Sequence, residues 1–156
     1  MVAADQKAGS GLLTPIDKEE DFVEKLCSTG IKVVEVYSPW VGPCVAIHPT
    51  LKQLRTVLSD NPSTAEVSVE FLSVPSDQIA ELEQFQGKSQ PHFLLYQNGH
   101  LKETIDGANA PALTKSVTSL AAEAADSQEN LDDNPRFVKK REEQVARYNS
   151  VTKPSQ

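Results

Sequence analysis

Cysteine is scarce in this sequence of 156 residues, which contains only Cys27 and Cys44, seventeen positions apart. The first twelve residues include Asp5 and Lys7 and hold no apolar run, so we expect no signal peptide. Two cysteines in a chain that is not secreted are better interpreted as reduced thiols than as a disulfide framework. We therefore expect a soluble, intracellular protein, with Cys27 acting as a small structural side chain.

Positive charge and long apolar runs are scarce as well. The 15 Lys and Arg residues are outnumbered by 22 Asp and Glu residues, which gives a net charge of −7. That balance argues against nucleic acid and against an anionic membrane surface as partners. No stretch reaches the roughly 18 apolar residues of a membrane span. A hydrophobic content of 38% is enough for one core, so we expect one domain with tails.

Apolar periodicity predicts an α/β fold. The run 31–37 is β-branched and bounded by turn residues, as is typical of a central strand covered on both faces. Pro15 restricts the first strand to a sheet edge, and the pair Asn98-Gly99 predicts a hairpin. We expect strands at 12–16, 31–37, 67–74, 93–96 and 101–105, and helices at 17–30, 43–58, 76–85 and 110–124. This order predicts a central mixed sheet flanked by helices.

Three local signals refine the helices. Asp17 is predicted as the N-cap of the first helix, with Glu20 reaching back to complete a capping box. Pro49 is expected to bend the second helix because its ring displaces a backbone hydrogen bond. Ser76 is expected to cap the third.

The segment from Trp40 to Cys44 carries the main chemical signal. A redox Cys-x-x-Cys site places its first cysteine at an exposed helix N-terminus, which lowers the pKa of the thiol and favours the thiolate. In Trp40-Val41-Gly42-Pro43-Cys44 that position is occupied by Val41, which has no ionisable group and cannot form a mixed disulfide. The segment thus keeps the frame of a dithiol site without its nucleophile.

This segment resembles the thioredoxin motif Trp-Cys-Gly-Pro-Cys with one substitution. The resemblance runs from about Leu12 to Ala122, and it implies a thioredoxin fold for a domain at 12–124. Five further residues fit the same pattern in order and spacing: Glu35, Pro49, Pro91, Gly99 and Gly107.

The resemblance also implies roles for individual residues. Cys44 corresponds to the shielded resolving cysteine, and Glu35 to a buried acid whose pKa burial raises. Trp40, Gln90 and Pro91 correspond to the walls of a shallow peptide groove, with a cis peptide bond before Pro91. Binding of an extended peptide in such a groove does not require a cysteine at position 41.

A narrower resemblance concerns 85–91 and 107–111. These segments resemble the thioredoxin-like light chains of axonemal outer-arm dynein, and the thioredoxin domains fused to nucleoside diphosphate kinase modules in ciliary proteins. The chain is too short for a kinase module. The resemblance implies a binding or structural subunit, with a dynein heavy chain or other axonemal subunits as partners. It places the protein in the cytoplasm and cytoskeleton, at the axoneme of a cilium or flagellum.

Two alternatives stay open. The protein is an enzyme or redox sensor that acts through Cys44, or it is a chaperone-like peptide binder of the cytosol. Val41 excludes the usual dithiol mechanism, so we favour a protein without reductase activity. His48 and His92 could in principle ligate a metal together with Cys44, but no close-spaced ligand pair supports a metal site. We expect no metal and no cofactor.

The two ends differ from the domain in composition. Residues 1–11 are small and polar and are expected to be disordered. The extension at 125–156 is acidic first and basic afterwards, and Asn134-Pro135 predicts a helix start. We expect this extension to have too little apolar surface to fold alone, and to bind a partner through Phe137, Val145 and Tyr148. The basic block at 136–141 is expected to pair with acidic groups of that partner.

Overall fold

The computed structural model describes residues 12–152, so the expectation for residues 1–11 lies outside the described part of the chain. Five strands form one sheet in the order β1-β3-β2-β4-β5. Their bounds are β1 (Leu13–Pro15), β2 (Ile31–Tyr37), β3 (Val69–Pro75), β4 (His92–Gln97) and β5 (His100–Asp106). β1, β3 and β2 run parallel, while β4 and β5 are antiparallel to their neighbours. The predicted mixed sheet is confirmed, with the Pro15 strand at its edge.

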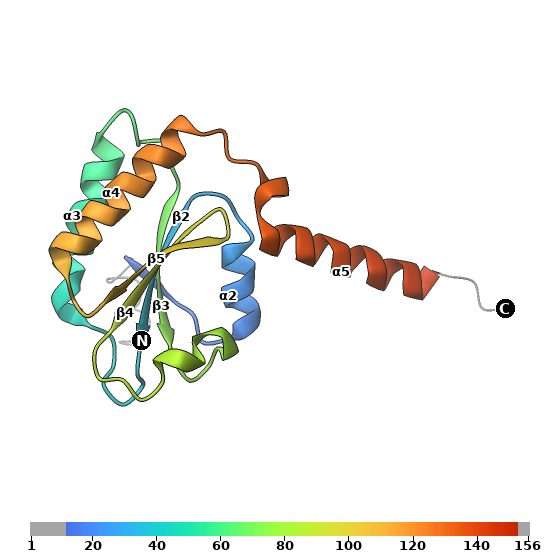
Figure 1. Cartoon of the computed structure of the whole chain (residues 1–156), viewed down its shortest axis with the longest axis horizontal. Coiled ribbons are helices and arrows are strands. Elements are labelled where there is room, and N and C mark those ends of the chain that lie inside the picture. Colours follow the sequence, from blue (N-terminus) through green and yellow to red (C-terminus); the bar gives the residue numbers. More distant parts are fainter. Residues whose placement is uncertain (1–11, 153–156) are drawn as a thin grey trace, which may run out of the picture.

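Helices cover both faces of the sheet (Figure 1). α3 (His48–Asp60) and α4 (Ala110–Asp126) pack on one face, while α2 (Glu19–Leu26) and the 3-10 helix η2 (Ala80–Phe85) pack on the other. Alternate residues of β2 supply the two cores, because successive side chains of a strand point to opposite faces. Val33 belongs to the cluster under α3 and α4, whereas Val34 belongs to the cluster under α2. The predicted α/β sandwich is therefore confirmed.

The predicted hairpin at Asn98-Gly99 is also confirmed. Both residues have positive φ, 47° for Asn98 and 79° for Gly99, as the tight two-residue turn between β4 and β5 requires.

The start of the first helix differs from its prediction. α2 begins at Glu19, and its N-cap is Lys18 rather than Asp17, with no side-chain cap hydrogen bond. The Lys18 carbonyl instead accepts the Phe22 N–H at 3.1 Å. Three acids in the first turn, Glu19, Glu20 and Asp21, complement the positive end of the helix dipole, so a capping box is not needed there.

The effects predicted for Pro49 and Ser76 are wrong. A 3-10 turn, η1 (Val45–Ile47), precedes α3, and Pro49 lies in the first turn of that helix. Its missing N–H costs nothing at this position, so it starts the helix instead of bending it. The segment η2 is a 3-10 helix whose N-cap is Ile79, and the buried Ser76 hydroxyl caps nothing.

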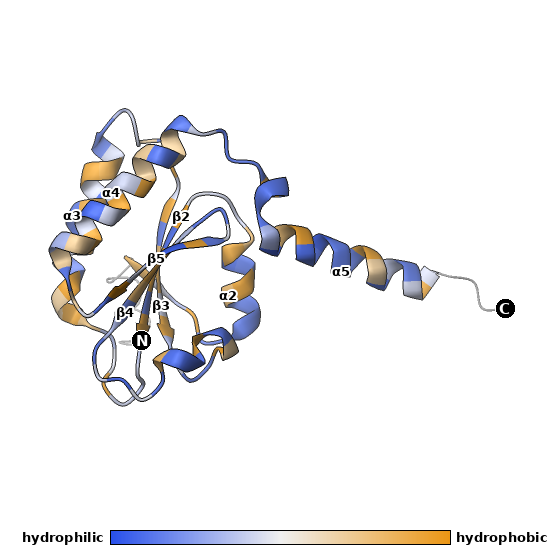
Figure 2. Cartoon of the chain, in the orientation of Figure 1, coloured by the Kyte–Doolittle hydropathy of each residue, from blue (hydrophilic) through white to orange (hydrophobic). Residues whose placement is uncertain are grey.

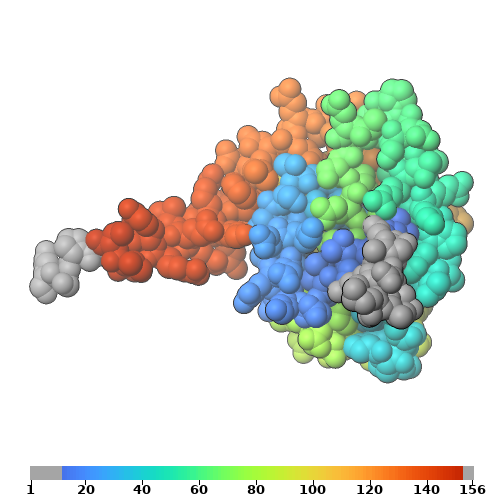
Figure 3. Space-filling view, turned by 180° about the vertical axis from the view of Figure 1, so that it is seen from behind, coloured from blue at the N-terminus to red at the C-terminus, as the bar shows by residue number. Residues whose placement is uncertain are grey.

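The C-terminal extension is helical. After α4 comes a 3-10 turn, η3 (Leu131–Asp133), followed by α5 (Pro135–Thr152), which confirms the helix start predicted at Asn134-Pro135. α5 projects away from the body of the molecule (Figures 1 and 3), and none of its residues is buried. Apolar and polar residues alternate along it (Figure 2). Among residues 12–152, no helix is both long and apolar enough to cross a membrane.

Candidate functional site

The segment from Pro39 to Cys44 leaves the end of β2 as a tight turn. The Ser38 carbonyl accepts hydrogen bonds from the N–H groups of Val41 at 3.0 Å and Gly42 at 2.9 Å. The Ser38 hydroxyl donates to the carbonyl of Lys88, which ties this turn to the loop that leads to Pro91. The turn is therefore anchored on both sides.

Trp40 and Val41 form the exposed tip of this turn, with 68% and 50% of their surfaces accessible. The position of Val41 differs from the prediction, because α3 begins only at His48 and the Val41 N–H is already bonded within the turn. A helix N-terminus therefore does not act on position 41. The tip offers apolar surface to a partner, and Val41 offers no ionisable group.

Glu35 lies on β2 beneath the turn and is completely buried. Its Oε2 accepts the backbone N–H of Cys44 at 2.8 Å, and its Oε1 accepts the Ser73 hydroxyl at 3.4 Å. Burial raises the pKa of this carboxyl, and the two hydrogen bonds offset part of that rise. Glu35 is therefore buried at the position where the resemblance implies a buried acid. Cys44 itself is a half-buried free thiol.

The loop before β4 carries Gln90 and Pro91, the other two residues of the predicted peptide groove. Gln90 is exposed and Pro91 is half-buried, and the Pro91 carbonyl accepts the Gly107 N–H at 2.7 Å. The predicted cis bond before Pro91 is wrong, since residues 12–152 contain no cis peptide bond. Trans is the intrinsically favoured isomer, and this loop accommodates it. That Trp40, Gln90 and Pro91 line a peptide groove stays a prediction.

The two histidines near the site have separate surroundings. His92 is buried on β4, with its Nδ1 at 2.8 Å from Asp106 Oδ1 and its ring 4.7 Å from that of Phe85. His48 begins α3. Within the described part of the chain, no three side chains of the metal-binding types come together.

Cys27 lies elsewhere, at the end of α2. It is buried and lines a small hollow of about 310 Å³ between α2 and α5, together with Phe137. Burial raises the pKa of its thiol, while the charges of Lys140 and Arg136 act in the opposite direction. A buried thiol with a raised pKa is a poor nucleophile, which agrees with the structural role expected for it.

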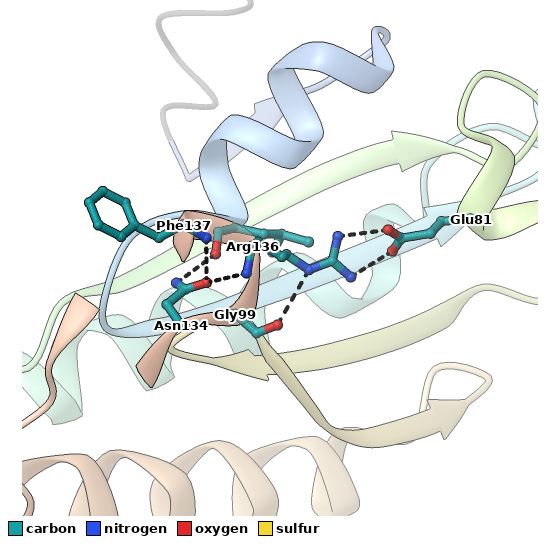
Figure 4. A network of polar contacts seen from close by, with 6 residues as sticks. Glu81, Gly99, Asn134, Arg136 and Phe137 are labelled. Atoms are coloured by element: carbon teal, nitrogen blue, oxygen red, sulfur yellow. Dashed lines mark hydrogen bonds and ion pairs between the residues drawn. The ribbon is translucent and has the colours of Figure 1, made fainter. Parts of the chain in front are cut away.

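Three residues of the basic block, Arg136, Lys140 and Arg141, have acidic neighbours within the chain, while pairing of the block with a partner stays a prediction. Arg136 forms a bidentate ion pair with Glu81, at 2.6 and 2.9 Å (Figure 4). Arg141 pairs with Asp132 at 2.8 Å, and Lys140 lies 4.0 Å from Glu24. Glu81 and Glu24 belong to the domain, whereas Asp132 lies in the extension itself. Of the three predicted tail contacts, Phe137 is half-buried against the body, while Val145 and Tyr148 are exposed.

Sequence reasoning missed Glu81 and Asn134 as contact residues. Asn134 was recognised only as a helix start, yet it is completely buried. Its contacts reach Leu26 and Ser28, more than a hundred positions earlier in the chain, and no local pattern encodes them.

The family model "Thioredoxin" matches residues 14–119. The chain belongs to the thioredoxin family. It is 41% identical over 140 residues to "Dynein 16 kDa light chain, flagellar outer arm" of Chlamydomonas reinhardtii, covering 87% of this chain and 86% of that protein. It is 35% identical over 111 residues to "Dynein 14 kDa light chain, flagellar outer arm" of the same organism, covering 70% and 81%.

Solved structures agree on the fold. The crystal structure of oxidised mitochondrial thioredoxin 3 from Saccharomyces cerevisiae superposes with a TM-score of 0.55 at 24% identity, covering 70% of this chain and 97% of that one. The thioredoxin fold predicted from the sequence is therefore confirmed. The superposition covers nearly all of the yeast thioredoxin but leaves about 30% of this chain without a counterpart.

Proposed function

We propose that this protein is a thioredoxin-like light chain that acts as a binding or structural subunit of an axonemal outer-arm dynein complex. The observation that carries the proposal is the 41% identity to a flagellar outer-arm dynein light chain over most of both chains. This likeness extends beyond the thioredoxin match, into the charged extension. The protein would then reside at the axoneme of a cilium or flagellum, and its partner would be a dynein heavy chain or a neighbouring subunit.

The composition of the turn supports a function without dithiol chemistry. Thiol–disulfide exchange needs a thiolate that attacks the substrate disulfide, and exposed position 41 is valine. The remaining thiol, Cys44, is half-buried behind the turn and is not in a disulfide. Its backbone N–H donates a hydrogen bond to Glu35. The alternative, an enzyme or redox sensor acting through Cys44, lacks the exposed nucleophile.

Two surfaces are proposed for the binding function. The first is the tip around Trp40 with Gln90 and Pro91, where an extended peptide would pair with backbone groups. The second is α5, where Val145 and Tyr148 expose 54% and 68% of their surfaces. The domain at 12–124 and the extension at 125–156 would thus each contribute an attachment.

The test is affinity purification of the tagged full chain from axonemal extract, with identification of co-purifying chains. The same tag on a dithiol thioredoxin serves as control, since it shares the fold. We expect outer-arm dynein subunits with this chain and none with the control. Equal recovery with both baits, or recovery of cytosolic clients without dynein, would overturn the proposal.

A further inference from the structure

Residues 129–137, which we call the latch, connect α4 to the free part of α5. They lie against one end of the sheet, where the chain enters β2 and where the β4–β5 hairpin turns. The latch begins at Glu129, whose Oε2 accepts the Gly30 N–H at 2.7 Å and whose Oε1 accepts the Gln97 side-chain amide at 3.1 Å. Next to it, the Asn98 amide donates to the Asn130 carbonyl at 2.9 Å.

Asn134 is the centre of the latch. Its Nδ2 donates to the carbonyls of Leu26 at 3.0 Å and Ser28 at 3.3 Å, where α2 ends. Its Oδ1 accepts the N–H groups of Arg136 at 3.0 Å and Phe137 at 3.1 Å, so the same side chain caps the start of α5 (Figure 4). One buried amide therefore joins the end of α2 to the start of α5.

Close approach at this point depends on Gly99. A Cβ atom added there would lie 2.2 Å from Asn134 Oδ1, which no side chain could tolerate without displacement. The hairpin glycine and the latch asparagine are thus fitted to each other.

Arg136 connects the latch to η2 and to the β4–β5 hairpin. Besides its two hydrogen bonds to Glu81, its Nε donates to the Gly99 carbonyl at 3.3 Å, and its guanidinium lies 5.6 Å from the centre of the Tyr96 ring. The guanidinium of arginine is planar and carries five N–H donors, so one side chain can bind a carboxylate and a carbonyl while it stacks on an aromatic ring. η2, the hairpin and α5 meet at this one side chain.

Beyond the latch, α5 packs little of its surface against the rest of the protein. Residues 141–152 are all exposed, and an isolated helix of this length is marginal in water. The direction of α5 must therefore come from its first two turns, where Asn134 and Arg136 make most of the contacts and Lys140 and Arg141 add ion pairs with exposed side chains. We propose that the latch is a positioning element, which fixes α5 to the thioredoxin domain as a rigid arm and so presents the arm and the Trp40 tip at a set separation. The use of this separation in binding rests on the proposed function, whereas the rigidity itself does not.

The test measures the arm directly, without any partner. Spin labels are placed at Lys115→Cys on α4 and Ala146→Cys on α5, both exposed, in a full chain with Cys27→Ala and Cys44→Ala. Distance distributions from pulsed electron paramagnetic resonance are compared for the parent, Asn134→Ala and Arg136→Gln. Arg147→Gln is the matched control, because it removes an arginine of α5 outside the latch.

We expect a narrow distribution in the parent and in Arg147→Gln, and one about twofold wider or more in the two latch variants. A broad distribution in the parent, or an unchanged one in both latch variants, would overturn the proposal. Arg136→Gln keeps the test valid if Asn134→Ala fails to fold, because it changes a partly exposed side chain and leaves the buried Asn134 in place. If the parent gives a narrow distance distribution but the tagged chain recovers no dynein subunits, the proposed function is rejected and the latch proposal is kept. The failure of one proposal can therefore be told from the failure of the other.

Discussion

The backbone N–H of Cys44 donates a hydrogen bond of 2.8 Å to the completely buried carboxylate of Glu35. In this chain the acid therefore fixes the backbone at the end of the turn that carries Trp40 and Val41. With no cysteine at position 41, it has no dithiol to serve as a proton acceptor or donor. Its burial disfavours the charged form, so its presence costs stability at neutral pH unless the hydrogen bonds compensate fully.

This cost leads to a pH prediction. Because the pKa of Glu35 is raised in the folded protein, the folded state binds the proton more tightly than the unfolded chain does. The free energy of unfolding should then fall as pH rises from the ordinary carboxyl pKa, about 4.3, through the raised value in the folded protein. Glu35→Gln should remove that fall and gain about 1.4 kcal/mol at neutral pH for each unit of elevation.

The measurement is urea unfolding of the parent and Glu35→Gln at several pH values. Glu83→Gln is the control, since it removes an exposed carboxylate of the same kind. If Glu35→Gln is less stable than the parent at neutral pH, the carboxylate contributes more through its hydrogen bonds than it costs through burial. That result would reject the prediction.

A second prediction concerns the missing nucleophile. The purified protein should show no insulin-type disulfide reduction with a thioredoxin reductase, because Val41 provides no thiolate. Val41→Cys should form a reducible disulfide with Cys44 when treated with glutathione disulfide, which free-thiol titration detects. Val57→Cys, at an exposed position on α3, is the control, and its new thiol and Cys44 should both stay free of an internal disulfide. Turnover by the parent at a rate like that of a dithiol thioredoxin would favour the enzyme alternative.

A third prediction separates close packing from backbone strain. Gly99 and Gly87 have nearly equal φ, 79° and 78°, so alanine is strained by about 1–2 kcal/mol at both. Only at Gly99 does the new Cβ meet Asn134, while at Gly87 it meets nothing within 4 Å. Gly99→Ala should therefore cost more than Gly87→Ala, by about 1–3 kcal/mol for an overpacked site.

Thermal and urea unfolding of both variants measure this difference. Equal losses of stability would mean that Asn134 does not lie against the hairpin. Because the backbone strain is about the same at Gly99 and Gly87, the difference in stability between the two variants measures the contact between Asn134 and the hairpin.

The elements that could be predicted from the sequence are those encoded by a few neighbouring residues. The strand 31–37 and the Asn98-Gly99 turn were recognisable because periodicity and turn chemistry are encoded within a few residues. The same holds for Val41, whose meaning came from its neighbours in the motif. Pro49 was misjudged because its effect depends on where the helix begins, and the preceding 3-10 turn moved that start to His48.

The latch could not be predicted because its contacts are not local. Arg136 and Glu81 are 55 positions apart, and no spacing rule relates them. A run of basic residues is compatible both with binding a partner and with pairing inside the chain, and the positions of Glu81, Asp132 and Glu24 are not encoded near that run.

The last prediction concerns the free part of α5. Since Arg136, Lys140 and Arg141 have acidic neighbours within the chain, docking through this helix should depend on its apolar side chains and vary little with salt. Replacing the exposed pair, Val145→Ser with Tyr148→Ser, should weaken recovery of dynein subunits from axonemal extract about tenfold, which corresponds to about 1.4 kcal/mol. Leu101→Ser, an exposed apolar residue on β5, is the matched control.

Truncation gives the complementary comparison. A chain that ends after Arg141 keeps the latch and loses the free part of α5, whereas one that ends after Ala125 loses both. We expect equally poor recovery from the two truncations, with circular dichroism showing a folded domain in each. Recovery that survives truncation after Arg141 but not after Ala125 would move the attachment from Val145 and Tyr148 to the latch and Phe137. Full recovery with both would leave the tip around Trp40 and Pro91, or the edge of the sheet, as the binding surface.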